Sequence, residues 1–380
     1  MELDLNTIRK KINEIDEKLV ALFEERMETV SKVAAYKKQH NMKILDSSRE
    51  KEVIARAIEH LQNKSLETYL RFFMDDLLTL SRQYQLSQLS ENQKPVFCQA
   101  ERNTEPAVIG HYGSPGSYSE EAALLYFGRD ITRKPCMTFD EVVSSLLKKE
   151  IDIGVLPVEN SSTGIIAAAM DLIRDNKVYI TGEHVLKICH HLLVLPGTKL
   201  EDIKTVYSHQ QGLEQSSCFL KQYPWEQIAY HSTASSAGLI RKLGDKTKAA
   251  VASENCAQMY GLEILVPNIQ YNQDNYTRFI MIEREPVVNE HCNKISIVMD
   301  IAHKPGALYA ILRLFNERSL NLLKIESRPI IGKPWEYLFF FDFEGNLTDP
   351  RVKELLGCLE DSAGEFRVLG NYRAYEEADR

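Results

Sequence analysis

Two adjacent polar residues, Thr277 and Arg278, directly precede an apolar run. That run, residues 279–282, reads FIMI and predicts the start of a buried strand. An arginine in this place either extends its charged end to water or binds an anion. The threonine hydroxyl beside it can donate a hydrogen bond to a departing group. The pair is therefore a candidate site for an anionic substrate, and the rest of the chain must decide between the two explanations.

Small polar residues follow several predicted strands between residues 107 and 270, and they also open predicted helices. These stretches are 113–119, 159–162, 208–210, 232–234 and 252–253. Ligands of open α/β sheets bind beyond the carboxyl ends of the strands, and helix N-termini favour anions. Each stretch taken alone is better explained as an ordinary helix N-cap. The five together predict a cleft between two lobes, with Thr277 and Arg278 on the strand that crosses back.

The first 90 residues contain a second group of residues with chemical potential. Apolar residues recur in alternating steps of four and three, at Ile8, Ile12, Ile15, Leu19, Leu22, Val30 and Val33. Arg26 and Lys37 fall on the same seam, and Arg9 lies one residue beside it. Buried charges need partners, although snorkelling from a helix edge also explains these cations. A helix over residues 7–40 would be about 50 Å long, so we expect a second chain to cover it.

Further polar residues follow this predicted helix. Asp46, Arg49 and Glu50 stand at the start of the next one, and Ser81 and Gln85 lie one turn apart on a third. With the cations they would form a pocket of several positive charges, one carboxylate and polar donors.

Composition excludes several classes of function. A net charge of −8 without a dense Lys/Arg cluster argues against nucleic-acid binding. No apolar run is long enough for a membrane span, and the first residues resemble no signal peptide, so we expect a cytoplasmic protein. The seven cysteines are scattered. The triplet Cys189-His190-His191 lacks a second ligand pair, so no metal site is predicted.

Changes in composition and in the spacing of apolar residues divide the chain into domains. Residues 1–90 lack proline and glycine and predict an all-α domain, and residues 91–106 predict a polar linker. Residues 107–284 alternate short apolar runs with amphipathic segments, as in a mostly parallel α/β fold. Residues 294–373 give the order β-α-β-β-α-β of an α+β ferredoxin-like domain.

The first 90 residues resemble the all-helical chorismate mutase family, through the spaced Arg, Arg, Lys, Asp, Arg-Glu and Ser-x-x-x-Gln pattern quoted above. The resemblance implies an interlocked homodimer in which Arg9 comes from the partner chain. Chorismate is a dicarboxylate that rearranges without a nucleophile, so positive charge beside the breaking ether oxygen is what it needs. Lys37 and Gln85 suit that oxygen, and the arginines suit the carboxylates.

Residues 107–284 resemble prephenate dehydratases, through the Pro-x-Glu-Asn, Ser-His, Ser-Thr-x-x-Ala and Thr-Arg-Phe motifs in this order. The resemblance implies a two-lobed fold similar to periplasmic binding proteins and an essential Thr277. Near the prephenate it implies the residues Glu159, Asn160, Ser208, Gln215 and Arg278. Glu159 is a candidate proton source for the departing hydroxyl. One departure is that Gln210 and Gln211 follow His209, where the family usually has Pro-Gln, which puts the loop shape in doubt.

The last domain resembles the ACT domains attached to prephenate dehydratases. The Gly-Ala-Leu motif is Gly306, Ala307 and Leu308, and the Glu-Ser-Arg-Pro motif begins at Glu326 and Ser327. The resemblance implies that L-phenylalanine binds between two such domains. A turn and a capped strand end would explain the same residues without a ligand.

The sequence thus predicts a bifunctional chorismate mutase and prephenate dehydratase, multidomain, without a cofactor, and inhibited by phenylalanine. We expect a homodimer, and a tetramer stays open. One rival is a non-catalytic sensor of small molecules, which would not need the catalytic cations and threonine. Another is a dehydratase whose helical domain serves only for dimerisation.

Overall fold

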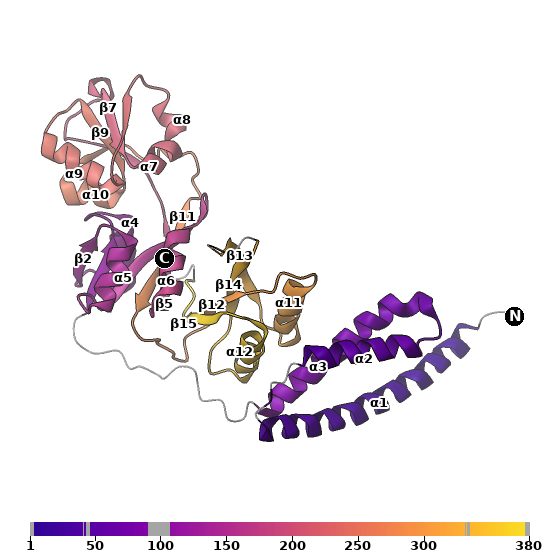
Figure 1. The fold of residues 1–380 in the computed structure, drawn as a ribbon. Coiled ribbons are helices and arrows are strands. Elements are labelled where there is room, and N and C mark those ends of the chain that lie inside the picture. The colour runs from indigo at the N-terminus through magenta and orange to yellow at the C-terminus, as the bar shows by residue number, and fades with distance from the viewer. Residues whose placement is uncertain are drawn as a thin grey trace. The chain divides into compact units, whose positions relative to one another are not determined.

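The computed structural model describes residues 4–40, 42, 46–89, 107–330, 332 and 335–376. They form two compact units, one of residues 1–96 with Pro350–Ser362 and one of residues 97–349 with 363–380 (Figure 1). The linker expected at 91–106 lies outside the described residues.

The first unit is helical, in agreement with the periodicity of the sequence. Its elements are α1 (Leu5–Gln39), α2 (Ser47–His60), the 3-10 turn η1 (Lys64–Leu66), α3 (Glu67–Leu89) and α12 (Pro350–Ser362). Asp4 is the N-cap of α1, and its carboxylate accepts hydrogen bonds from the backbone N–H groups of Asn6 and Thr7. Most of the apolar seam of α1 is exposed in the single chain, Leu22 to 61%.

The second unit begins with two lobes of α/β structure. The first lobe contains β1 (Val108–Tyr112), α4 (Tyr118–Phe127), β2 (Thr132–Cys136), α5 (Phe139–Leu147), β3 (Ile153–Asn160), β4 (Gly164–Ile165), α6 (Ala167–Asp175), β5 (Tyr179–Lys187) and β11 (Tyr276–Glu283). The second lobe contains β6 (His191–Val194), η3 (Leu200–Asp202), β7 (Thr205–Ser208), α7 (Gln210–Gln215), α8 (Ser217–Leu220), β8 (Glu226–Ala229), α9 (Thr233–Leu243), β9 (Lys248–Ala252), α10 (Glu254–Tyr260) and β10 (Glu263–Val266). The second lobe has a sheet of its own, in the order β10-β6-β9-β7-β8.

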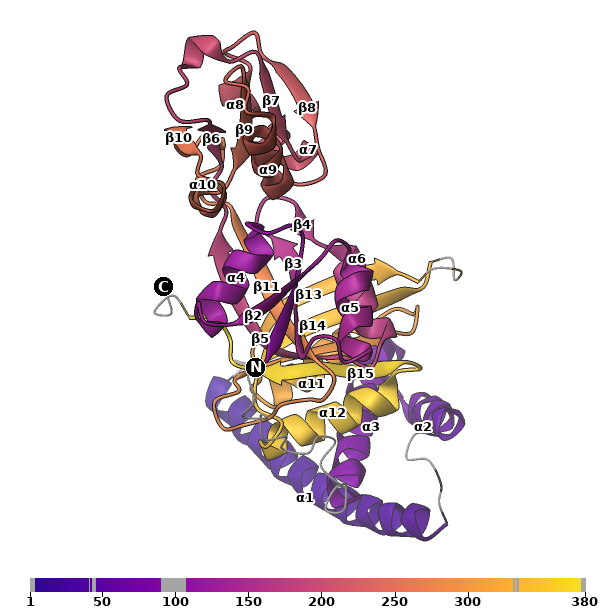
Figure 2. The same ribbon diagram turned by 90° about the vertical axis from the view of Figure 1, so that its left-hand side faces the viewer.

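The rest of the second unit consists of β12 (Lys294–Asp300), α11 (Ala307–Glu317), β13 (Leu322–Pro329), β14 (Tyr337–Glu344) and β15 (Phe366–Tyr372). With α12 between β14 and β15 in the chain, the predicted β-α-β-β-α-β order is confirmed. These strands continue the sheet of the first lobe, in the order β13-β14-β12-β15-β5-β11-β3-β1-β2, with β4 beside β3 (Figure 2). The junction is one parallel pair, Gly370 with Ile180.

Strand β11 is buried on both faces, which explains the apolar run that follows Arg278. Ile280 and Ile282 belong to a core shared with α5, α6 and the strands β12, β14 and β15, whereas Phe279 and Met281 pack with residues of α4. The fold thus has the predicted all-α, two-lobed α/β and α+β parts, and β11 lies at the centre of the ten-stranded sheet.

Candidate active sites

The backbone pairs the two polar strand ends of the first lobe directly. Thr277 on β11 lies opposite Asn160 on β3. The Asn160 Nδ2 donates to Thr277 Oγ1 over 2.9 Å and to Asn275 Oδ1 over 2.7 Å. Both Asn160 and Thr277 are buried. The Thr277 oxygen accepts this bond, so its own hydrogen remains for a bound acceptor.

Asn160 is itself held by the loop that follows it. Its Oδ1 accepts from the backbone N–H groups of Ser162 and Thr163 over 3.0 and 3.1 Å. The Thr163 hydroxyl in turn lies 3.3 Å from Nε2 of Gln211 at the start of α7. The hydrogen bond between Gln211 and Thr163 therefore joins the two lobes. Asn160 connects Thr163 to Thr277.

A second polar group lies on the segment that leads out to the second lobe. His190 Nε2 is 2.9 Å from Gln215 Oε1, and its Nδ1 is 3.0 Å from the Tyr118 hydroxyl. Burial lowers the pKa of His190 to about 4, against a smaller opposing effect of the Gln215 hydrogen bond. His190 is therefore neutral at pH 7, and it connects Tyr118 of the first lobe with Gln215 of the second.

The two crossings between the lobes run beside each other. The backbone N–H of Ile188 donates to the Asn275 carbonyl over 2.8 Å, and that of Ile269 donates to the His190 carbonyl, also over 2.8 Å. The Asn160 and Thr277 pair thus lies at the return crossing, and His190 with Gln215 at the outgoing one.

Ser208 is fully buried at the end of β7, where its hydroxyl donates to the Val251 carbonyl over 2.7 Å. Gln210, which follows His209 where Pro is usual in the dehydratases that the sequence resembles, has a local role. Its Nε2 donates to Glu214 Oε1 one turn further along α7. Ser208 therefore stabilises the pairing of β7 with β9 in this structure.

Glu159 and Arg278 do not share the surroundings of Asn160 and Thr277. Adjacent residues of a strand point to opposite faces. Arg278 pairs across the strands with Glu159, their charged atoms 3.7 Å apart, on the face that meets β12–β15. The guanidinium of Arg278 is bound by Glu183, Asp342 and Tyr372. The expectation of one cleft holding all four residues is therefore corrected: they form two pairs on two faces.

Four of the predicted polar helix starts are true N-caps. The side chains of Ser117, His209, Ser232 and Ser253 accept backbone hydrogen bonds from the first turns of α4, α7, α9 and α10. The simpler explanation of these residues as caps therefore holds.

In the helical unit, α1 and α3 bring three of the predicted residues together. Arg26 Nη1 donates to the Ser81 hydroxyl, and Gln85 Nε2 donates to the Ser81 carbonyl over 3.2 Å. Burial lowers the pKa of Arg26. Gln85 Oε1 is buried without a hydrogen-bond partner in the described part of the chain. Donors of Arg26 and Gln85 and an acceptor of Gln85 thus lie close together between α1 and α3.

The other residues predicted for the helical site are only partly assembled. Asp46 caps α2 by accepting from the Arg49 backbone N–H, and Arg49 pairs with Glu52. Glu50 pairs with Arg82 of α3, a cation that the sequence analysis did not single out. Two residues remain, both on α1: Arg9 is 17 positions before Arg26, about 25 Å along the helix, and Lys37 is 11 positions after it.

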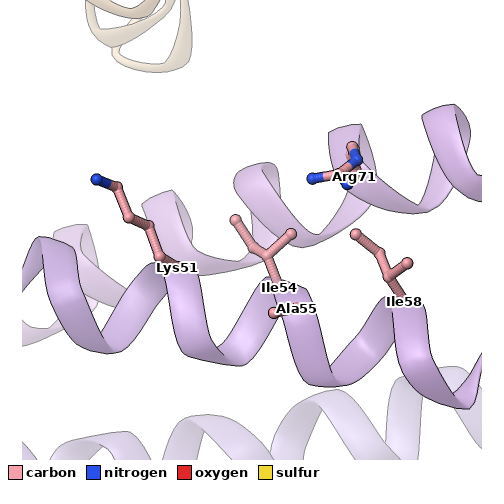
Figure 3. A pocket seen from close by; sticks show the side chains of 5 residues that line it. All are labelled: Lys51, Ile54, Ala55, Ile58 and Arg71. Carbon is pink, nitrogen blue, oxygen red and sulfur yellow. The ribbon is translucent and has the colours of Figure 1, made fainter.

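A pocket of 340 Å³ lies between α2 and α3 but contains none of these residues. It is lined by Lys51, Ile54, Ala55, Ile58 and Arg71 (Figure 3). Arg71 is already paired with Glu67. The lining offers too few polar partners for a dicarboxylate.

The residues predicted to bind phenylalanine occupy an edge of the second unit. Gly306 has φ of 80° and is the N-cap residue of α11, with Ala307 and Leu308 in its first turn. Strand β13, which carries Glu326 and Ser327, ends the ten-stranded sheet. Neighbouring residues of a strand point to opposite faces. Glu326 therefore lies on the same face of β13 as Lys324, and Ser327 lies on the other face.

Sequence reasoning missed Asn275 and His190. Asn275 is 1% exposed and binds Asn160, and its place two residues before Thr277 was the only available signal. The sequence around His190 suggests no role for it beyond the metal-like triplet with Cys189 and His191. Among the described residues, no group of His, Cys, Asp and Glu could hold a metal ion.

Fold and sites together define a class of protein: a multidomain enzyme with a helical domain, a two-lobed α/β domain and an ACT domain. The sequence matches the families chorismate mutase type II over residues 8–86, prephenate dehydratase over 109–287 and ACT domain over 295–357. Similar curated proteins are the "Bifunctional chorismate mutase/prephenate dehydratase" of Buchnera aphidicola (33% identity, 96% of this chain and 95% of that one) and of Aquifex aeolicus (33%, 97% and 98%). The chain belongs to the bifunctional chorismate mutase/prephenate dehydratase family.

Solved structures are similar over the larger unit. The prephenate dehydratase of Arthrobacter aurescens in complex with L-Phe is 29% identical, with a TM-score of 0.64, over 70% of this chain and 90% of that one. GqqA, described as a quorum quenching acylase, is 28% identical, with a TM-score of 0.65, over 72% of this chain and 100% of that one.

Proposed function

We propose that this chain converts chorismate to prephenate in its helical domain and prephenate to phenylpyruvate in its two-lobed domain, for phenylalanine biosynthesis. The observation that carries the second activity is the buried Asn160 and Thr277 pair at the crossing between the lobes. The first is supported by Arg26, Ser81 and Gln85, which α1 and α3 bring together.

In the dehydration, the bond between the ring and its carboxylate breaks and CO₂ leaves. The electron pair enters the ring, which becomes aromatic as the ring hydroxyl departs with a proton as water. Asn160 donates to Thr277 Oγ1 and so directs the threonine hydrogen toward a bound acceptor. In this proposal Thr277 donates that hydrogen bond to the departing hydroxyl, and Gln215, held by His190, binds the substrate. Glu159 lies on the other face, which does not support its role as proton source.

In the mutase reaction no atom enters or leaves, so the site supplies only a compact substrate conformation and positive charge. Lys37 and Gln85 serve the ether oxygen, and Arg26 binds a carboxylate. Because Arg9 is about 25 Å along α1 from Arg26, the Arg9 that completes each pocket comes from a second chain. The proposal therefore includes a homodimer, and the exposed apolar seam of α1 supports it.

Phenylalanine inhibits the dehydratase by binding at Gly306, Ala307, Leu308, Glu326 and Ser327, between two ACT domains. The positive φ of Gly306 and the free edge of β13 support this placement. A cytoplasmic location belongs to the same proposal. Cys136, Cys189, Cys218, Cys256 and Cys292 are free thiols, as reducing compartments favour, and none of the described helices could span a membrane.

Assays of the purified protein with chorismate alone and with prephenate alone test both activities. We expect turnover of each substrate. A sensor would turn over neither, and a dehydratase with a helical dimerisation domain would turn over only prephenate.

A further inference from the structure

Arg278 is at the centre of a buried group of charges that joins the dehydratase strands to the ACT strands. Its Nε lies 2.6 Å from Glu183 on β5, and its Nη1 lies 2.7 Å from Asp342 on β14. Lys294 on β12 completes the group, 2.9 Å from Glu183. Two cations thus meet two carboxylates on four strands.

This group has little freedom to rearrange. The four side chains are 14% exposed or less. Removal of one partner leaves an uncompensated buried charge, which is strongly unfavourable. Burial raises the pKa of Asp342, but Arg278 and Lys294 outweigh it, so the pKa lies below its ordinary value and the carboxylate is charged at pH 7.

A hydroxyl chain fixes the orientation of the guanidinium. Arg278 Nη2 donates to the Tyr372 oxygen over 2.7 Å. The Tyr372 hydroxyl is 2.6 Å from Ser296 Oγ, and Ser296 hydrogen-bonds Asp342. All three nitrogens of the guanidinium therefore have protein partners.

The strand pairing connects this group to the catalytic pair. Arg278 is the next residue after Thr277, and Glu159 is the residue before Asn160. Lys324 of the ACT strand β13 lies 2.7 Å from Glu159. On both strands that carry the catalytic pair, the residue next to the pair therefore binds an ACT side chain: Arg278 binds Asp342, and Glu159 binds Lys324.

We propose that Arg278 is a positioning residue, which Asp342 anchors so that Thr277 stays within hydrogen-bond distance of Asn160. This inference rests on the proposed dehydratase function and assigns Arg278 to it without contact with prephenate. It also provides a physical route for inhibition, because a shift of β13 or β14 moves β11 and β3 at the residues next to the catalytic pair.

The test compares full-length variants by kcat and KM for prephenate and by the phenylalanine concentration that halves the rate. Asp342→Asn keeps the shape and removes the charge, and Tyr372→Phe removes one hydroxyl. Arg284→Gln is the matched control, because its guanidinium binds the carbonyls of Leu146 and Ile151 beyond the other end of β11.

We expect Asp342→Asn to lower kcat by about 10²-fold, because small displacements at a reacting centre cost that much. KM should stay within about twofold of wild type, since prephenate binding is not lost. Tyr372→Phe should lower kcat less, by about tenfold, and both variants should shift the phenylalanine midpoint. Arg284→Gln should change neither quantity.

The proposal is overturned if folded Asp342→Asn and Tyr372→Phe keep the wild-type kcat and midpoint, which would show that the charges serve stability alone. It is also overturned if Arg278→Lys raises KM and leaves kcat unchanged, as a substrate-binding arginine would. Thermal unfolding identifies a variant that fails to fold. If Asp342→Asn fails to fold, the kcat and midpoint of Tyr372→Phe decide the test. Wild-type protein without dehydratase activity would instead contradict the proposed function.

Discussion

The proposed role of Thr277 depends on its hydroxyl hydrogen. The hydroxyl oxygen already accepts a hydrogen bond from Asn160, so the hydrogen is left to donate to the substrate. Thr277→Val keeps the shape and removes this donor. We expect the dehydratase kcat to fall by about 10²–10³, the effect of deleting one preorganised donor, with the mutase rate unchanged. Thr277→Ser keeps the hydroxyl and should retain more activity than valine. Normal dehydratase turnover in Thr277→Val would rule out the role.

Lys37 is the residue on which the proposed mutase reaction depends most. Lys37→Ala should remove charge stabilisation of roughly 3–4 kcal/mol, or about 10²–10³ in mutase rate. Its neighbour Lys38 points about 100° away around α1, so Lys38→Ala is a matched control that should stay near wild type. The dehydratase rate of both variants should be unchanged. A joint loss of both activities in folded Lys37→Ala would contradict separate sites.

At this scale the sequence predicted residue types better than their directions. Thr277 and Asn160 do meet, as the motif order implied, but Glu159 and Arg278 lie on the other face. The reason is the alternation of side chains along a strand: Thr277 and Arg278 are neighbours on β11, and Glu159 and Asn160 are neighbours on β3, so each strand turns one of its two residues to each face. The pairing becomes irregular only beyond these residues, where Phe279 pairs with Pro157 and Val158 is an extra residue in β3, and no pattern in the sequence marks that bulge.

Among the helices, α4 of the first lobe and α10 of the second face each other across a pocket of 500 Å³. Burial, with a smaller contribution from Glu254 on α10, raises the pKa of Glu121 on α4 to about 7. Glu121 Oε2 is buried without a hydrogen-bond partner in the described residues. Ionised Glu121 is therefore unfavourable in the folded state.

The sign of the resulting pH dependence follows from linkage. The folded state holds the Glu121 proton more tightly than the unfolded state, whose pKa is the ordinary 4.5. Stability is therefore lost as pH rises from about 4.5 to 7 and is constant above. Glu121→Gln should raise the unfolding temperature at pH 8 and leave it unchanged at pH 4.5, relative to wild type. An equal effect at both pH values would refute the assignment.

Element order could be predicted from sequence because helices and strands alternate with different periods. The merging of two domains into one sheet could not. It depends on β15 lying beside β5, where the paired residues Gly370 and Ile180 are 190 positions apart in the chain, and Gly370 with its neighbours carries no signal for that partner. The buried charges show the same limit, since Glu183 and Asp342 are unremarkable in the sequence.

On the scale of the whole molecule, the proposed regulatory site acts on the dehydratase through bound phenylalanine. Equilibrium dialysis of phenylalanine with Gly306→Val and Glu326→Ala tests the regulatory site. Valine is strained at φ of 80°, and alanine removes the carboxylate that we expect to hold the ammonium. Both variants should lose phenylalanine binding and keep dehydratase turnover in its absence. Undiminished affinity in both would place the site elsewhere.

Thermodynamic linkage also requires that phenylalanine and prephenate affect each other's binding equally. If phenylalanine favours a less active arrangement by tenfold, the coupling is about 1.4 kcal/mol, and prephenate must weaken phenylalanine binding by the same factor. Dialysis with and without a non-reacting prephenate analogue would measure that factor. Equal phenylalanine affinities in the two conditions would mean that the sites are not coupled.

The junction of the ten-stranded sheet also has a mechanical meaning. Strands β11 and β5 are paired at eight positions, whereas β15 and β5 are paired at one, Gly370 with Ile180. A Cβ on residue 370 would lie 2.1 Å from the Ile180 carbonyl oxygen, so the seam closes only with glycine there. Under load a sheet parts where the fewest backbone hydrogen bonds break together. A pull on the C-terminal end reaches β15 first, and parting β15 from β5 breaks one backbone pair, whereas parting β11 from β5 would break eight.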